Sequence, residues 1–115
     1  MREINRRRTL LAAVALTVLG SVAHAQGFPN KPIRLICPFP PAGAVDIASR
    51  AIAAELSKNL GQPVTVENRP GAGGNIGGTE AARAAPDGYT IFMTTSGIQG
   101  INPALYAKMP FDPNK

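Results

Sequence analysis

Histidine and cysteine are almost absent from this chain of 115 residues. There is one histidine, His24, and one cysteine, Cys37. A single cysteine excludes an internal disulfide framework. Cys37 ends a short apolar run, and Arg34 in that run would point to the opposite face of a strand. We therefore interpret Cys37 as a small core residue and not as a reactive thiol, which would need a cationic neighbour.

The first 25 residues have the pattern of a cleavable export signal. Arginines at positions 2, 6, 7 and 8 precede an uncharged apolar run over residues 10–22, and Ala23 and Ala25 stand where a signal peptidase reads small residues. An uncleaved anchor helix is the alternative, but a bilayer needs about 20 apolar residues and this run is shorter. We predict a signal peptide over 1–25 and a protein that works outside the cytoplasm. The Arg7-Arg8 pair leaves both Sec and twin-arginine export open.

Charge in the remaining chain is nearly balanced. The predicted signal holds four of the twelve basic residues and one of the seven acidic residues, so the mature net charge is +2. No basic cluster follows Lys31, which gives nucleic-acid binding little support. His24 would leave with the signal, which excludes a histidine-activated nucleophile and a histidine zinc site. We expect neither an enzyme nor a cofactor.

Proline and glycine cluster between short apolar runs, which is typical of turns between elements of one small domain. The pattern predicts strands over 33–37, 63–67 and 89–95. Helices are predicted over 46–60 and 75–85, with a short helical piece over 104–106. Alternating strands and helices at this spacing indicate an α/β fold with a parallel sheet.

Two polar residues are predicted to cap the helices. Asp46 is the expected N-cap of the first helix, and Asn75 the expected cap of the second in preference to a direct ligand contact. The first helix ends at Gly61. Its inward face is predicted to be apolar and its outward face polar. The inward residues would be Ala48, Ile52, Leu56 and Leu60, and the outward residues Arg50, Glu55, Ser57 and Lys58.

The loops that follow parallel strands line one crevice, and here they span 38–45, 68–74 and 95–102. All three are rich in Gly, Ser, Thr or Asn. The helix N-termini after Ala44 and Gly74 would direct partial positive charge at that space, which predicts an anionic guest, most simply a carboxylate. Glycine-rich turns are equally common as structural punctuation. Arg69 could pair with a second ligand carboxylate, although a solvated turn arginine is the favoured interpretation.

Several motifs in order along the chain point to one family. They are the segments 31–36, 38–43 with Asp46, 61–64, 68–77, 85–90 and 101–106. Together they closely resemble the tripartite tricarboxylate transporter solute-receptor family, also called the Bug family of periplasmic binding proteins. The resemblance covers essentially the whole predicted mature chain.

The resemblance implies a receptor that binds a small carboxylate between two α/β lobes and delivers it to membrane permease subunits, most simply as a monomer. Residues 26–115 would be the N-terminal part of lobe 1, an incomplete first lobe of a type II periplasmic-binding-protein fold. The matched ligand-binding residues are Pro41, Ala42, Gly43, Ala44 and Asp46 after the first strand and Thr95, Ser96 and Gly97 after the third, with Arg69 and Asn75 as possible supporting residues.

This sequence departs from the family pattern at two positions of the first loop. Ala42 replaces a usual glycine, and Val45 replaces a frequent hydroxyl residue. Alanine would keep its N–H available to a ligand if its φ stayed negative, whereas valine removes a possible hydrogen bond. The second lobe is missing, so we expect a fragment or a truncated gene product that is marginally stable and a weak binder by itself.

Two alternative functions from other protein classes stay open. The run 71–77 resembles the glycine-rich fingerprint of a nicotinamide-binding oxidoreductase. However, Ile76 occupies a position that needs Gly or Ala, and this fingerprint normally follows the first strand. A small α/β domain without a ligand is the other alternative.

Overall fold

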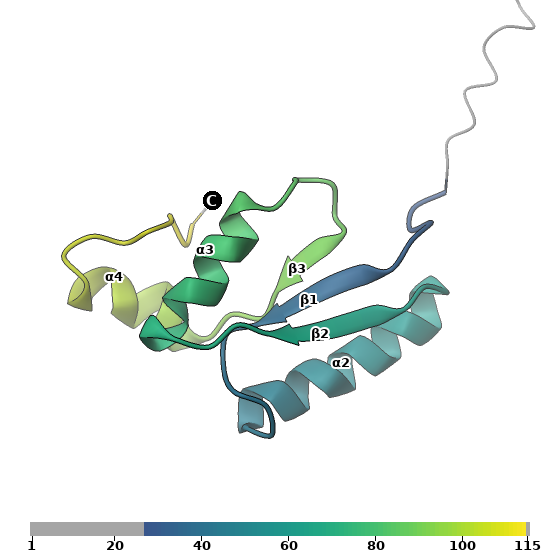
Figure 1. Cartoon of the computed structure of the whole chain (residues 1–115), viewed down its shortest axis with the longest axis horizontal. Helices are drawn as coiled ribbons and strands as arrows, with labels where there is room; N and C mark the ends of the chain where they lie inside the picture. The colour runs from purple at the N-terminus through teal and green to yellow at the C-terminus, as the bar shows by residue number, and fades with distance from the viewer. Residues whose placement is uncertain (1–26, 115) are drawn as a thin grey trace, which may run out of the picture.

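The computed structural model describes residues 27–114, so the predicted signal peptide lies outside the described residues (Figure 1). The predicted alternation of strands and helices is confirmed. The elements in chain order are β1 (Ile33–Cys37), α2 (Ala44–Leu60), β2 (Val64–Asn68), the 3₁₀ turn η2 (Ala72–Gly74), α3 (Asn75–Arg83), β3 (Thr90–Phe92), the π-helical turn η3 (Gly97–Ile101) and α4 (Asn102–Leu105). No helix in this part of the chain is long and apolar enough to span a membrane.

The three strands form a parallel sheet in the order β2-β1-β3. β1 is the central strand, with one strand on each side and one helix on each face. This position explains why all its residues except Arg34 are apolar. Leu35 is 2% exposed and Ile36 is fully buried. Burial of each such side chain stabilises the fold by roughly 1.5–3 kcal/mol. Cys37 is also fully buried, and its thiol donates to Phe39 O at 3.7 Å, as expected for a core residue.

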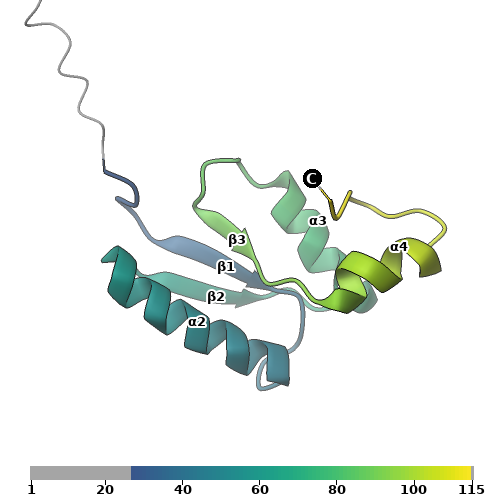
Figure 2. The same cartoon turned by 180° about the vertical axis from the view of Figure 1, so that it is seen from behind.

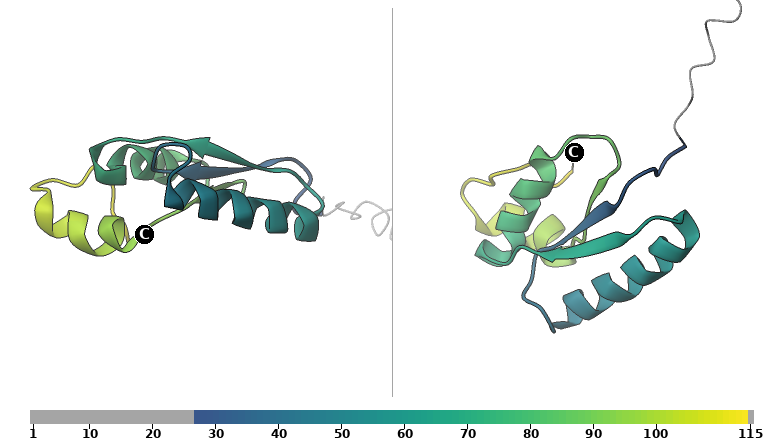
Figure 3. Two further views of the ribbon diagram at one scale, coloured as in Figure 1. Left: turned by 90° about the horizontal axis from the view of Figure 1, so that it is seen from below. Right: turned by 45° about the vertical axis from the view of Figure 1, so that its right-hand side comes forward.

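α2 and α3 lie on opposite faces of the sheet (Figures 1 and 2). The α2 face holds Ser57, whose Oγ accepts a 2.8 Å hydrogen bond from the backbone N–H of Val64 at the start of β2. The α3 face holds Arg34 of β1, which bonds to Glu80 of α3. Figure 3 shows the same three layers from below and obliquely. The chain therefore forms a helix–sheet–helix sandwich with β1 at its centre.

The predicted inward face of α2 is wrong at Ile52. The other predicted inward residues are half-buried, and three of the four predicted outward residues are exposed; these are Ala48, Leu56 and Leu60, and Arg50, Glu55 and Lys58. Ile52 is 43% exposed, whereas Asp46, Ser49 and Ala53 are buried. Ser49 is small and donates its hydroxyl to the carbonyl of Val45, so it can lie against the sheet without an unsatisfied polar group. The apolar periodicity did not identify the most buried positions of α2, because small and polar residues occupy them.

β3 is shorter than its predicted range of 89–95. β1 ends at Cys37 because Pro38 has no N–H to continue the ladder. Met93 makes the last backbone bond toward β1, with its N–H donating to Ile36 O at 2.9 Å. The chain then turns into η3 and α4, so most of the predicted loop over 95–102 is helical.

Candidate functional site

The loops after β1, β2 and β3 leave the sheet at the same end (Figure 1). Backbone hydrogen bonds hold them together, since Arg69 N–H donates to Cys37 O at 2.8 Å. Gly74 and Gly77 let these loops pack closely, because added Cβ atoms there would lie 3.4 Å and 3.1 Å from Pro38 Cβ. The geometry thus brings the predicted site loops to one edge of the sheet, as expected for parallel strands.

Ala42, in the first loop, adopts a left-handed conformation with φ of 65°. Its N–H donates to Asp46 Oδ2 at 3.0 Å. The negative φ that would keep this donor available is therefore not observed, and the N–H is occupied by the protein itself. The positive φ gives a physical reason for the glycine that the family pattern has at this position.

Asp46 is not the N-cap of α2. The helix begins at Ala44 with Gly43 as its N-cap, and Asp46 lies in the first turn, 2% exposed. Its carboxylate also accepts hydrogen bonds from Arg50 Nε at 2.9 Å and from Asn68 Nδ2 at 2.8 Å. Arg50, Asn68 and the Ala42 N–H lower the pKa of Asp46 from 3.8 to about 2. The carboxylate is thus ionised and fully engaged within the protein.

The N-terminus of α2 retains uncommitted backbone donors. The first intrahelical bond runs from Ile47 N–H to Gly43 O, so the N–H groups of Gly43, Ala44 and Val45 precede the hydrogen-bonded ladder. Gly43 and Ala44 are exposed, as is Pro41. These donors and the partial positive charge of a four-turn helix suit a carboxylate oxygen.

The N-terminus of α3 does not offer the donors that we expected. Gly74 N–H donates to Gly71 O at 3.0 Å, and the Asn75 N–H donates to Ala72 O. Ile76 N–H reaches Gly71 O at 3.5 Å. The 3₁₀ turn therefore uses these groups internally, which also removes the pyrophosphate-binding helix end that a nicotinamide enzyme requires.

Asn75 is likewise not a cap. Gly74 is the N-cap of α3, and no side chain caps this end. Asn75 is 3% exposed, and its Oδ1 accepts a 2.9 Å bond from Asn102 Nδ2, which also donates to Gly73 O at 3.0 Å. Asn102, which the sequence did not single out, therefore ties the loop after β2 to α4. Its only sequence signal is its position before Pro103 at the start of a helix.

The loop after β3 is organised by Thr95. Its Oγ1 accepts from Ile98 N–H at 3.4 Å, and its carbonyl accepts from Gln99 N–H at 3.0 Å. Thr95 thus begins the η3 turn, and its hydroxyl accepts a bond there while its own O–H remains a possible donor. Ser96 is exposed, and Gly97 is half-buried.

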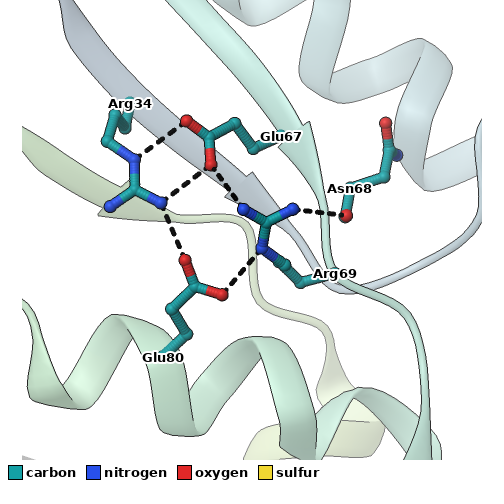
Figure 4. Close-up of polar contacts among 5 residues, drawn as sticks. All are labelled: Arg34, Glu67, Asn68, Arg69 and Glu80. Atoms are coloured by element: carbon teal, nitrogen blue, oxygen red, sulfur yellow. Dashed lines mark hydrogen bonds and ion pairs between the residues drawn. The ribbon is translucent and has the colours of Figure 1, made fainter.

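Arg69 belongs to a ring of four alternating charges (Figure 4). Its Nη2 lies 3.1 Å from Glu67 Oε2 and its Nε 2.8 Å from Glu80 Oε2. Arg34 bridges the same two carboxylates, with Nη2 at 2.7 Å from each. Arg34 and Arg69 lower the pKa of both carboxyls, Arg34 being the main cause. The Arg69 side chain is 44% exposed, as a turn arginine would be, but its guanidinium is paired with two carboxylates of the protein.

We expect Glu67→Gln to lower the free energy of unfolding by about 1 kcal/mol at low salt, because it removes the carboxylate that both arginines share. Urea unfolding at low and high salt would measure the loss, which should shrink at high salt. Glu55→Gln is the matched control, since the Glu55–Lys58 pair is about 70% exposed on both sides and should change stability by only a few tenths of a kcal/mol. Equal losses at the two positions would contradict the importance of the ring.

A cavity of about 650 Å³ lies on the α3 side of the sheet, away from the first loop. Its walls include Arg34, Thr79, Glu80 and Pro110, and none of the residues 41–46. The N-terminus of α2 is open surface in contrast. We place the candidate site at the loops because the N–H groups at the start of α2 precede the hydrogen-bonded ladder, whereas Arg34 and Glu80 beside the cavity are paired with each other. Among residues 27–114, no three His, Cys, Asp or Glu side chains come together as metal ligands.

A profile described as the tripartite tricarboxylate transporter family receptor matches residues 48–115. The chain belongs to this receptor family. A UPF0065 protein of Bordetella pertussis is 43% identical over 88% of the chain, and the BugT protein of the same organism is 42% identical over 76%. The chain spans about a third of the length of these relatives, 31% and 28% respectively.

Solved structures of periplasmic binding proteins share the fold. The periplasmic binding protein BugD is 40% identical, with a TM-score of 0.71 over 75% of this chain and 28% of BugD. MatC from Rhodopseudomonas palustris, solved with bound malate, is 41% identical, with a TM-score of 0.73 over 76% of this chain and 30% of MatC. An R. palustris protein solved with adipate has a TM-score of 0.74 and 38% identity, over 76% of this chain and 29% of that one. The predicted family and α/β fold class are confirmed.

Proposed function

We propose that the protein carrying this sequence is a periplasmic receptor that binds a small carboxylate for a tripartite tricarboxylate-type transporter. Residues 1–25 would be its signal peptide, and residues 26–115 the N-terminal part of its first lobe. The receptor would act as a monomer that delivers its ligand to the membrane permease subunits. Family membership supports the role of a solute receptor over an enzyme.

One observation carries the proposal of an anionic ligand. The N-terminus of α2 presents Gly43 and Ala44 at the carboxyl end of the sheet, and both are exposed residues whose N–H groups precede the hydrogen-bonded ladder. The nearest acid, Asp46, is neutralised by Arg50, so it does not oppose a bound anion. Two family members that resemble this chain were solved with malate and with adipate, both dicarboxylates. Loop residues Pro41 to Ala44 and Thr95 to Gly97 would then surround one carboxylate group.

Calorimetry on the full-length protein would test this function. The panel would contain acetate, malate, adipate and citrate, together with the uncharged diamides of malate and adipate. We expect at least one carboxylate to bind with an affinity at least about tenfold above that of its uncharged analogue, because charge-assisted bonds to the loop donors are lost in the amide. Binding of the uncharged compounds alone would overturn the proposal.

A separate measurement tests the alternative of a nicotinamide-binding oxidoreductase. The fluorescence of reduced nicotinamide should not change when the protein is added.

A further inference from the structure

The loop that presents the ligand donors contains a residue in an unfavourable conformation. Ala42 has a φ of 65°, which L-amino acids other than glycine rarely adopt. It immediately precedes Gly43 and Ala44, which are exposed residues and whose N–H groups precede the hydrogen-bonded ladder of α2. A rotation of Ala42 toward negative φ would reorient the peptide group that follows it. The direction of the Gly43 N–H therefore depends on whatever keeps Ala42 in the left-handed conformation.

Asn68 is the residue that connects this loop to the sheet. It is the last residue of β2 and pairs in register with Cys37 of β1, where the first loop begins. Its Nδ2 donates to Phe39 O at 2.9 Å and to Asp46 Oδ1 at 2.8 Å. One amide group thus holds the loop directly at Phe39 and, through Asp46, at the Ala42 N–H.

Arg50 completes the arrangement from the second turn of α2. Its Nε donates to Asp46 Oδ2 at 2.9 Å, and its Nη2 lies 3.3 Å from Asn68 Oδ1. The buried carboxylate of Asp46 therefore has donors from the loop, from the strand and from its own helix. We call Asp46, Arg50 and Asn68 the loop clamp.

We propose that Asn68 is a positioning residue for ligand binding, which keeps Ala42 left-handed through the loop clamp so that the Gly43 and Ala44 N–H groups face the ligand carboxylate. This inference rests on the proposed function and deepens it. Asp46 then acts through the loop and not by touching the ligand, because its oxygens already accept bonds from the protein.

The test is a rescue experiment on the full-length protein, with the tightest-binding member of the panel of acetate, malate, adipate and citrate as probe. Asn68→Ala should weaken binding about tenfold, the cost of a loop that no longer favours the left-handed state at Ala42. Adding Ala42→Gly should restore affinity to within about threefold of the unsubstituted protein, because glycine adopts positive φ without being held. Ala42→Gly alone provides the reference affinity against which the double variant is compared.

Ala72→Gly is the matched control for the rescue. Ala72 also has a positive φ, 48°, but it lies in the loop after β2. Added to Asn68→Ala, it should relieve comparable strain without restoring affinity. Arg50→Gln serves as a milder variant that will fold, since this side chain is 54% exposed, and a loss of about threefold is expected. Circular dichroism would confirm folding of each variant.

The outcomes separate the two proposals. If the unsubstituted protein binds no carboxylate, the proposed function is overturned and the inference falls with it. If it binds and both Asn68→Ala and Arg50→Gln keep full affinity, the inference alone is overturned. Equal rescue by Ala42→Gly and Ala72→Gly would also overturn it, because general stabilisation would then explain the effect.

Discussion

Gly74→Ala should destabilise the protein by about 3 kcal/mol, the largest effect that we expect from a single methyl group. Gly74 has a φ of 93°, which strains any residue with a side chain. Its added Cβ would also lie 2.5 Å from Ile98 Cδ1 and 2.8 Å from Ile98 Cγ1. Ile98 is 1% exposed and has no room to move aside. Thermal and urea unfolding of the full-length protein would measure the loss.

Substitutions at three other glycines distinguish the cost of backbone strain from the cost of steric overlap. Gly61 has a φ of 67° with no atom within 4 Å of an added Cβ, so Gly61→Ala should cost only about 1 kcal/mol. Gly78 has an ordinary φ, and the three atoms nearest to its added Cβ all belong to the ring of Phe111, which is half-buried, so Gly78→Ala would test overlap without strain. Gly100 has neither problem, so Gly100→Ala should be nearly neutral. A loss at Gly74 no larger than that at Gly61 would show that the contact with Ile98 is unimportant.

Local patterns were sufficient to predict the order of the elements and the position of the site loops. The bounds of β1 agree with the prediction because two prolines enclose an apolar run. The predicted start of α3 at Asn75 is also confirmed, since glycine marks the residue before it. These features depend on residues that are close together in the sequence, where turn chemistry and periodicity act directly.

The orientation of α2 could not be predicted in the same way. Its inner side is set by contacts with β2, such as the bond from Val64 N–H to Ser57 Oγ. A serine that accepts a hydrogen bond from the sheet looks like a surface residue when only hydrophobicity is considered. Ile52 misled the prediction in the opposite direction, since it remains exposed.

The roles of Asp46 and Arg69 were missed for a similar reason. Asp46 bonds to Asn68, 22 positions away, and Arg69 bonds to Glu80, 11 positions away. Each residue has a plausible local role, as a helix cap or as a turn arginine, that needs no distant partner. Only the folded sheet brings the charges together, so the pairing becomes visible in the structure and not in the spacing.

We expect Asp46→Asn to lower the stability of the protein at neutral pH and to remove part of its acid sensitivity. The amide that replaces the carboxylate presents an N–H to a site where Ala42, Arg50 and Asn68 already donate. One hydrogen-bond acceptor is lost, and a buried donor is left facing other donors. A lower midpoint of thermal unfolding at pH 7 would report the first effect.

The second effect follows from the pKa of Asp46, which the fold lowers from 3.8 to about 2, chiefly through Arg50. Because the folded pKa is the lower one, the stabilisation is complete above about pH 4 and is lost as the pH falls toward 2. At pH 3 the unfolded chain binds about 0.8 more protons at this carboxyl than the folded chain does. In Asp46→Asn, the slope of the unfolding free energy against pH should therefore fall by the equivalent of about 0.8 protons near pH 3. Glu55→Gln should leave most of this slope in place. An unchanged pH dependence in Asp46→Asn would show that the buried carboxylate is not held ionised by its three donors.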